Sequence, residues 1–205
     1  MLIRTPPSAQ LGFVLAHGAG AGMRHPFLDG ITEALFERGV ATLRYDFDYM
    51  AEGRARPDPP AVAARRVRKA VESARFEWPD LPLIAGGKSF GGRMTSTAQA
   101  EEPMENVRGL VFLGFPLHPP GRPSEHRAEH LFRVQVPMLF LQGTRDEFAQ
   151  LDLITAVCGR LSTRATLELV EEANHSFKVP KRTGRTPGQV LELLADRIAE
   201  WGTGL

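Results

Sequence analysis

Ser89 stands in the part of the sequence with the clearest capacity for chemistry. Residues 86–92 read GGKSFGG, so a glycine lies two residues before this serine and another two residues after it. An apolar run precedes the segment and a helix-like run follows it. This pattern at a strand-to-helix junction is typical of a sharp turn that lifts the hydroxyl above a sheet, because glycines let the neighbouring backbone come close. It predicts Ser89 as a nucleophile.

A serine hydroxyl is a weak nucleophile until a base takes its proton and a carboxylate orients that base. Asp146 comes just after a predicted strand at 137–141, and His175 comes just after another at 166–170. The carboxyl ends of parallel strands meet at one edge of a sheet, where ligands bind in open α/β folds. We therefore predict that Ser89, Asp146 and His175 form a catalytic triad, in the chain order serine, acid, histidine.

Other acids near these positions fit the role less well. Taken singly, Asp146 could instead cap the helix that follows it, and His175 could be a surface-loop histidine. Asp152 lies inside a predicted helix. Glu171 and Glu172 are too close in sequence to His175 and follow the wrong strand.

The negative charge that develops during acyl transfer requires two backbone N–H donors, an oxyanion hole. Phe90 should supply one of them, since it follows the nucleophile. The loop after the first predicted strand, residues 17–22 (HGAGAG), should supply the second. We predict Ala19 as that donor, with Gly18 and Gly20 as the alternatives, and expect His17 to make structural hydrogen bonds within this loop.

Basic residues near these segments raise the question of substrate charge. Lys88 precedes the nucleophile, and His118 lies in a proline-rich connection; both are predicted to contact substrate. A cationic rim could favour anionic substrates, while the alternative is ordinary solvated surface charge. The residues concerned are Arg24, Lys88, Arg93, Arg145 and Lys178.

Short apolar runs alternate with stretches of helical spacing along the whole chain, which predicts parallel βαβ units with helices on both sheet faces. The expected fold class is α/β, a three-layer α/β/α sandwich on a mostly parallel six-stranded sheet, with residues 1–205 as a single domain. The segment 115–136 is expected to be a loop or small cap, not a large lid. The predicted strands are 12–16, 40–45, 81–85, 107–113, 137–141 and 166–170, and a capping box at Thr186–Gln189 should open the last helix.

With these residues assembled, the chain resembles the α/β-hydrolases, and more closely the compact dienelactone-hydrolase-like group with its testis-expressed and NSL-complex-subunit relatives. The matching segments are HGAGAG (17–22), GGKSFGGR (86–93), FPLHPPG (115–121), LQGTRD (141–146) and NHSFK (174–178). The resemblance implies the same triad and hydrolase activity without an agreed substrate. Dienelactone hydrolases themselves use a cysteine nucleophile, so their specific activity does not carry over to a chain with Ser89.

Composition and charge limit the kinds of molecule that this protein is expected to bind. The net charge is +1, which favours neither nucleic acid nor anionic membrane, and no apolar run is long enough to span a bilayer. The first ten residues lack a signal pattern, and Cys158 is the only cysteine, so we expect a cytoplasmic protein. We expect a small-molecule acyl substrate, no metal or organic cofactor, and a monomer or homodimer.

The sequence partly matches two nucleotide-binding motifs, and each match is broken at one position. A P-loop would need a glycine where Pro82 stands, and a dinucleotide fingerprint would need its third glycine where Met23 stands. The sequence thus predicts a serine hydrolase of the carboxylesterase or thioesterase kind, which forms an acyl-enzyme on Ser89. The alternative is a non-catalytic interaction module that keeps this fold.

Overall fold

A seven-stranded sheet forms the centre of the molecule in the computed structural model, which describes all 205 residues. The strand order is β1-β3-β2-β4-β5-β6-β7, and every neighbouring pair except β1–β3 is parallel. The strands are β1 (Leu2–Arg4), β2 (Leu11–Ala16), β3 (Val40–Tyr45), β4 (Leu83–Lys88), β5 (Val107–Leu113), β6 (Met138–Gly143) and β7 (Ala165–Val170).

The predicted α/β fold with a mostly parallel sheet is confirmed, and the predicted count of six strands is one too low. The additional strand, β1, is antiparallel to β3 at the edge of the sheet, with Leu2 opposite Arg44. It spans three residues, too few to show a recognisable alternation of apolar and polar side chains.

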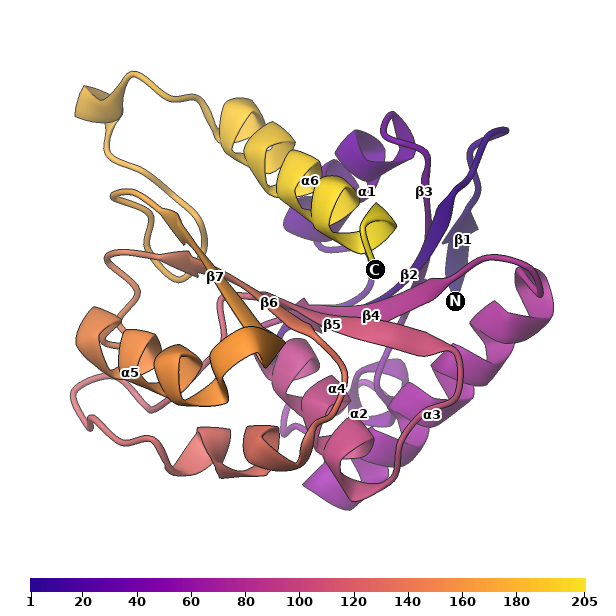
Figure 1. The fold of residues 1–205 in the computed structure, drawn as a ribbon, viewed down its shortest axis with the longest axis horizontal. Helices are drawn as coiled ribbons and strands as arrows, with labels where there is room; N and C mark the ends of the chain where they lie inside the picture. Colours follow the sequence, from indigo (N-terminus) through magenta and orange to yellow (C-terminus); the bar gives the residue numbers. More distant parts are fainter.

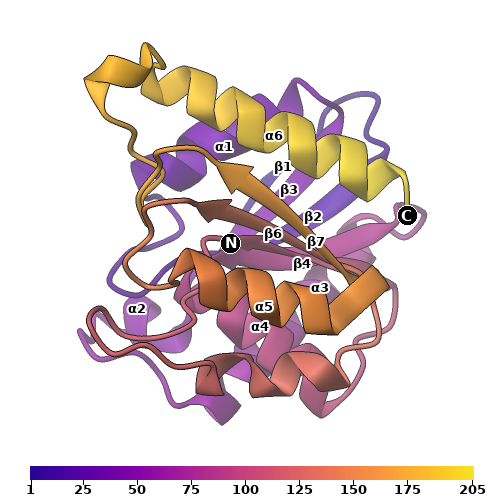
Figure 2. The same cartoon turned by 60° about the vertical axis from the view of Figure 1, so that its left-hand side comes forward.

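Helices cover both faces of the sheet (Figures 1 and 2). On one face lie α1 (Pro26–Phe36) and α6 (Pro187–Thr203), which pack against each other above β2, β3 and β6. On the other lie α3 (Pro60–Glu77), α4 (Phe90–Glu101) and α5 (Leu151–Leu161), with the short α2 (Asp48–Ala51) beside α3. Two apolar clusters, one on each side of the sheet, form the core. The predicted capping box of Thr186 and Gln189 opens α6.

The connection from β5 to β6 contains η1 (His126–Arg133), a 3-10 helix that packs against α4 and α5. Two shorter 3-10 helices, η2 (Ser162–Arg164) and η3 (Lys181–Thr183), flank β7. Figure 1 shows the β5–β6 connection running below the sheet beside the helices. The expectation that the chain has no large lid is therefore confirmed.

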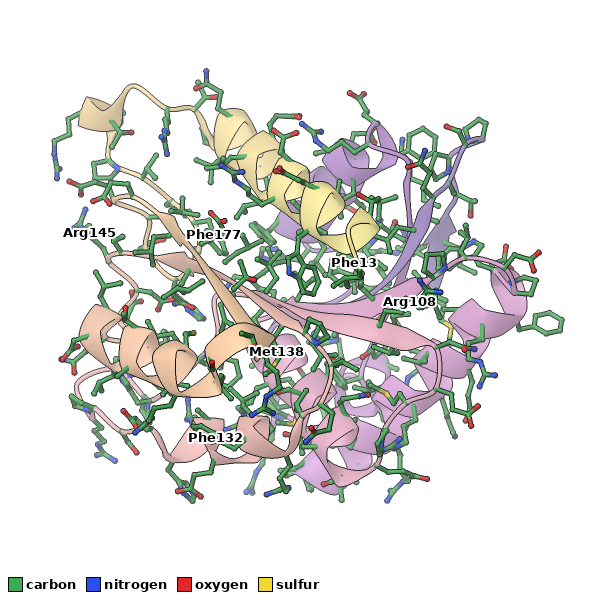
Figure 3. All side chains as sticks on the ribbon, viewed as in Figure 1. Phe13, Arg108, Phe132, Met138, Arg145 and Phe177 are labelled. Atoms are coloured by element: carbon green, nitrogen blue, oxygen red, sulfur yellow. The ribbon has the colours of Figure 1, made fainter.

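The carboxyl ends of the parallel strands meet along one edge of the sheet. Figure 3 shows Arg145 and Phe177, which follow β6 and β7, on the left of the molecule, while Arg108 near the start of β5 lies to the right. The loops at this left-hand edge carry Ser89, Asp146 and His175.

Strand β4 continues through its glycines and ends directly before Ser89, three residues later than predicted. The sequence pattern predicts a glycine-rich turn from Gly86 on, because glycine is disfavoured in strands. The structure gives the reason for glycine at position 87. A Cβ there would lie 2.2 Å from the carbonyl oxygen of Ala16 on the neighbouring strand β2. The strand can pass β2 at this point only without a side chain.

We predict that Gly87→Ala lowers the free energy of unfolding by about 3 kcal/mol or more, since the added methyl group meets backbone atoms that cannot turn aside. Urea denaturation at pH 7 measures the change. Gly159→Ala in α5 is the matched control, because a Cβ at Gly159 meets nothing within 4 Å and alanine favours a helix. Equal unfolding midpoints for the two variants would contradict the packing described at Gly87.

Candidate active site

Ser89 lies at the junction of β4 and α4 in a strained backbone conformation. Its φ is 49° and its ψ is −114°, in a region that residues other than glycine rarely occupy. Its N–H donates to the carbonyl oxygen of Leu113 at the end of β5, 3.2 Å away. Strain of this kind costs on the order of 1–3 kcal/mol and persists where the surrounding structure fixes the position of a functional group.

The three side chains predicted as a triad form one hydrogen-bonded chain. Oγ of Ser89 is 2.8 Å from Nε2 of His175. On the other side of the ring, Nδ1 of His175 lies 2.8 Å from Oδ2 and 3.0 Å from Oδ1 of Asp146. With its proton on Nδ1, the imidazole presents an unprotonated Nε2 to the serine hydroxyl. This arrangement can take a proton from the hydroxyl and hold the resulting charge beside a carboxylate.

Asp146 is buried and held by further donors that the sequence reasoning missed. Nε2 of Gln142 donates to its Oδ2 over 2.6 Å, and the N–H of Phe148 donates to its Oδ1 over 2.8 Å. The amide oxygen of Gln142 also accepts from the N–H of Phe115, 2.9 Å away, so one side chain joins the loops after β5 and β6. Gln142 could have been noticed as the only polar side chain in the buried strand β6.

The side chain of Asn174 holds the loop that carries His175 in a turn. Oδ1 of Asn174 accepts hydrogen bonds from the backbone N–H groups of Ser176 and Lys178, each over 3.0 Å. The ring of Phe148 lies against the imidazole, with the two centroids 4.3 Å apart. The imidazole is therefore fixed by a turn on one side and by an aromatic ring on another.

The predicted oxyanion donors lie on loops that flank Ser89. Phe90 is the first residue of α4, so its N–H has no partner within the helix. The α-carbon of Gly18 lies close to Ser89, since a Cβ built on it would be 3.8 Å from that of the serine. The N–H of Ala19 donates to no other backbone group. Both N–H groups are thus available to a substrate.

His17 orients the peptide group between Gly18 and Ala19. Its Nδ1 donates to the carbonyl oxygen of Gly18 over 2.8 Å, and its Nε2 accepts from the N–H of Phe47 over 3.1 Å. Burial lowers the pKa of His17, which keeps the ring neutral in this tautomer. Because the carbonyl of Gly18 points to His17, the N–H of Ala19 in the same peptide group points the opposite way.

The structure does not bring His118 to the surface of the site. The side chain is 1% exposed, and both ring nitrogens face backbone groups. Nδ1 lies 2.9 Å from the carbonyl oxygen of Pro119, and Nε2 accepts from the N–H of Gln150 over 3.0 Å. No ring nitrogen remains for a substrate. The proposed substrate contact of His118 is replaced by a role in joining two loops.

Lys88 turns away from solvent as well. Its Nζ is buried without a hydrogen-bond partner and lies 5.6 Å from the centroid of the Phe177 ring. A Cβ at Gly114 would be 3.2 Å from this Nζ and 3.5 Å from both Oδ2 of Asp146 and Nδ1 of His175, so the ammonium borders the triad. Direct contact with substrate, as predicted from the sequence, would require the side chain to move.

The buried ammonium predicts a pH-dependent stability difference. Desolvation lowers the pKa of Lys88 to about 8, against the attraction of Asp146 and Glu147, while the unfolded chain titrates at its ordinary value near 10.5. The cost of burying the charge is present in full below pH 8 and disappears as the pH rises to 10.5. We expect Lys88→Met to raise the free energy of unfolding by about 1–3 kcal/mol at pH 7, and by much less at pH 10.

Urea denaturation of wild type and variant at both pH values measures this difference. Lys69→Met, at an exposed position of α3, is the control and should show no such pH dependence. A stability gain for Lys88→Met that stays constant from pH 7 to 10, or its absence, would contradict a buried charge.

A second serine–histidine pair lies further along α4. Oγ of Ser96 is 2.7 Å from Nε2 of His130. No carboxylate is hydrogen-bonded to the ring of His130 to orient it. Burial and the positive charges of Arg93 and Arg133 lower the pKa of His130 to about 4. Ser96 is fully buried within a regular helix, whereas Ser89 sits on a strained turn. The second pair therefore offers no exposed nucleophile.

The cations predicted around the site differ in their surroundings. Arg24 and Lys178 are exposed, and Arg145 lies 3.6 Å from the carboxylate of Glu172. Lys88 is buried as described, and Arg93 lies half-buried in the first turn of α4.

Comparison with known proteins agrees with this architecture. A family model described as "Alpha/beta hydrolase domain" matches residues 9–203. The structure is similar to a dienelactone hydrolase from Anabaena variabilis, with a TM-score of 0.76 at 24% identity over 97% of this chain and 88% of that one. It is also similar to an alpha-beta serine hydrolase homologue from Coxiella burnetii (TM-score 0.75, 19% identity, 97% and 89% covered). A serine hydrolase without lid from Xanthomonas campestris gives 0.73 at 21% identity, with 97% and 87% covered.

The chain belongs to the alpha/beta hydrolase family, since the family model covers nearly its whole length. Its fold is similar to that of a dienelactone hydrolase, the group that the sequence resembles. None of its helices is both long enough and apolar enough to cross a membrane.

Proposed function

We propose that this protein is a serine hydrolase that cleaves an ester, thioester or similar small acyl substrate through an acyl-enzyme on Ser89. The hydrogen bond of 2.8 Å between Oγ of Ser89 and Nε2 of His175 is the observation that carries the proposal. A base in contact with a hydroxyl at the apex of a strained turn is the arrangement that nucleophilic acyl transfer requires.

In the first half of the reaction Oγ of Ser89 attacks the carbonyl carbon of the substrate, and its proton passes to Nε2 of His175. Asp146 stabilises the imidazolium. The N–H groups of Phe90 and Ala19 hold the oxyanion, as does the positive end of α4. When the bond to the leaving group breaks, Nε2 returns the proton to the departing oxygen or sulfur, and the acyl group stays on Ser89.

In the second half a water molecule replaces the leaving group. His175 takes one proton from the water as its oxygen attacks the acyl carbon, and the tetrahedral intermediate collapses. Nε2 then gives this proton back to Oγ of Ser89, and the acid is released. The protein's own groups supply every proton transfer in this cycle. The absence of a large lid supports an open site and a preference for short acyl chains.

Pre-steady-state hydrolysis of p-nitrophenyl acetate tests the proposal. We expect a burst of p-nitrophenol equal to the enzyme concentration, because acylation of Ser89 by an activated ester precedes slower deacylation. Ser89→Ala should abolish both the burst and turnover. Ser96→Ala, which removes the serine of the second pair, should keep the burst. A folded wild-type protein that turns over none of a panel of esters and thioesters would favour the non-catalytic interaction module.

A further inference from the structure

Two arginines beside the proposed nucleophile carry charges that no carboxylate of the protein neutralises. Arg93 lies in the first turn of α4 and Arg127 in η1, and both are half-buried. Arg93 makes no ion pair and its guanidinium donates no hydrogen bond, while Arg127 has one long contact, 3.4 Å, to the carbonyl oxygen of Pro116. Half-buried cations normally find a partner, because desolvation of an unpaired charge is costly.

The other half-buried arginines of this chain follow that rule. Arg164 donates to the carbonyl oxygens of Phe132 and Val134. The rest each lie within 4.0 Å of a carboxylate, and they are Arg4, Arg38, Arg44, Arg66 and Arg68. Arg93 and Arg127 are therefore exceptions within their own structure.

No carboxylate forms an ion pair with either of the two arginines, although acids lie nearby in the sequence. Arg93 and Arg127 stand on α4 and η1, two elements that pack against each other. Burial lowers the pKa of both guanidinium groups, and the positive charge of Arg127 lowers the pKa of Arg93 further. The two acids of this region face other partners, Glu125 with Arg160 and Glu129 with the exposed ring of His126. Two close, desolvated cations without an acid destabilise the protein unless an anion binds between them.

Both groups lie at the edge of the sheet where the triad is. The backbone N–H of Arg93 donates to the carbonyl oxygen of Ser89 over 3.1 Å, and a helical side chain leans toward the N-terminus of its helix, here toward Ser89. Arg127 reaches Pro116, two residues after Gly114, which borders Asp146 and His175. The cations are thus placed to meet a substrate group some distance from the acyl carbon.

We propose that Arg93 and Arg127 bind a carboxylate carried by the substrate, so that this hydrolase prefers acidic esters to neutral esters of the same length. The inference rests on the proposed function, because the carboxylate is placed relative to an ester held at Ser89. Guanidinium groups match a carboxylate through paired N–H donors. Neither group has to break an existing ion pair to accept it.

The test compares kcat/KM for mono-p-nitrophenyl adipate, which carries a free carboxylate, with kcat/KM for p-nitrophenyl hexanoate, its neutral counterpart. A second pair, 4-acetoxybenzoate and its methyl ester, places the carboxylate on the alcohol side. For the wild type we expect a preference of about 10- to 100-fold for the acidic member of one pair, as for a hydrogen bond to a charged group. Arg93→Gln and Arg127→Gln should each reduce that ratio about tenfold.

Arg133→Gln is the matched control, because it removes the same charge from an exposed position of η1 and should leave the ratio unchanged. A wild-type ratio near one in both pairs would overturn the proposal. So would a preference that persists in the Arg93→Gln Arg127→Gln double variant.

Binding without turnover separates this inference from the proposed function. Adipate should raise the Tm of the wild type and not that of the double variant, whether or not any ester is hydrolysed. An equal shift in both proteins, or none in the wild type, would overturn the carboxylate site. A shift with inorganic phosphate but not with adipate would overturn it in favour of a phosphate group. Failure of the proposed function alone would appear as no ester turnover together with the arginine-dependent adipate shift.

Discussion

Replacing His175 by alanine is expected to lower kcat for ester hydrolysis by a factor on the order of 10⁶, an effect as large as that of removing the nucleophile itself. Nε2 of His175 is the only base within hydrogen-bond distance of Oγ of Ser89, at 2.8 Å. Without it the hydroxyl keeps its proton during the attack, and the leaving group departs without one. Steady-state kinetics with a p-nitrophenyl ester measure the loss.

His126→Ala is the control for a general effect of removing a histidine. His126 is exposed in η1, and the one hydrogen bond of its side chain is to Glu129, so activity should stay within about twofold of the wild type. A folded His175→Ala protein that retains a tenth of the wild-type rate would show that another group activates Ser89.

Asp146→Asn should lower kcat by about 10⁴ while the fold is retained. In the wild type every neighbour of this carboxylate is a donor: Gln142 and the N–H of Phe148, besides Nδ1 of His175. An asparagine replaces one acceptor oxygen by an NH₂ group. If the NH₂ faces Nδ1, the imidazole must carry its proton on Nε2, the wrong tautomer for a base. If it faces Phe148 instead, two donors oppose each other.

Asp152→Asn tests whether the acid has been assigned correctly. Asp152 lies in the first turn of α5 on the exposed surface, and its loss should leave the rate within about twofold of the wild type. Steady-state kinetics together with circular dichroism of both variants measure the effect. The reverse outcome, with activity lost in Asp152→Asn and kept in Asp146→Asn, would remove Asp146 from the site.

The α/β/α layers of this fold could be predicted from the sequence, because the spacing of apolar residues and the positions of turn residues distinguish its strands from its helices. The predicted strands 40–45 and 107–113 coincide with β3 and β5. The second is apolar nearly throughout, as expected for a strand covered on both faces. The edge strand β1 could not be predicted, because three residues of which none is buried are too few to show a periodic pattern. The end of β4 was misplaced because its glycines serve close strand packing there, not a turn.

The positions of Ser89, Asp146 and His175 followed from topology, because each lies just past the end of a predicted parallel strand. What surrounds them depends on side-chain directions that a sequence does not contain. The inward turn of Lys88 and the burial of His118 are of this kind. The lack of an ion pair at Arg93 is a third example. It can be recognised only in the structure, where the carboxylates of Glu125 and Glu129 face Arg160 and His126.

The most direct test of the central claim is labelling with a fluorophosphonate probe followed by intact mass and peptide mapping. The account predicts one adduct per chain, on Ser89, which Ser89→Ala and His175→Ala each abolish and Ser96→Ala retains. A wild-type protein that is folded and stays unlabelled, or an adduct mapped to any other serine, would contradict it.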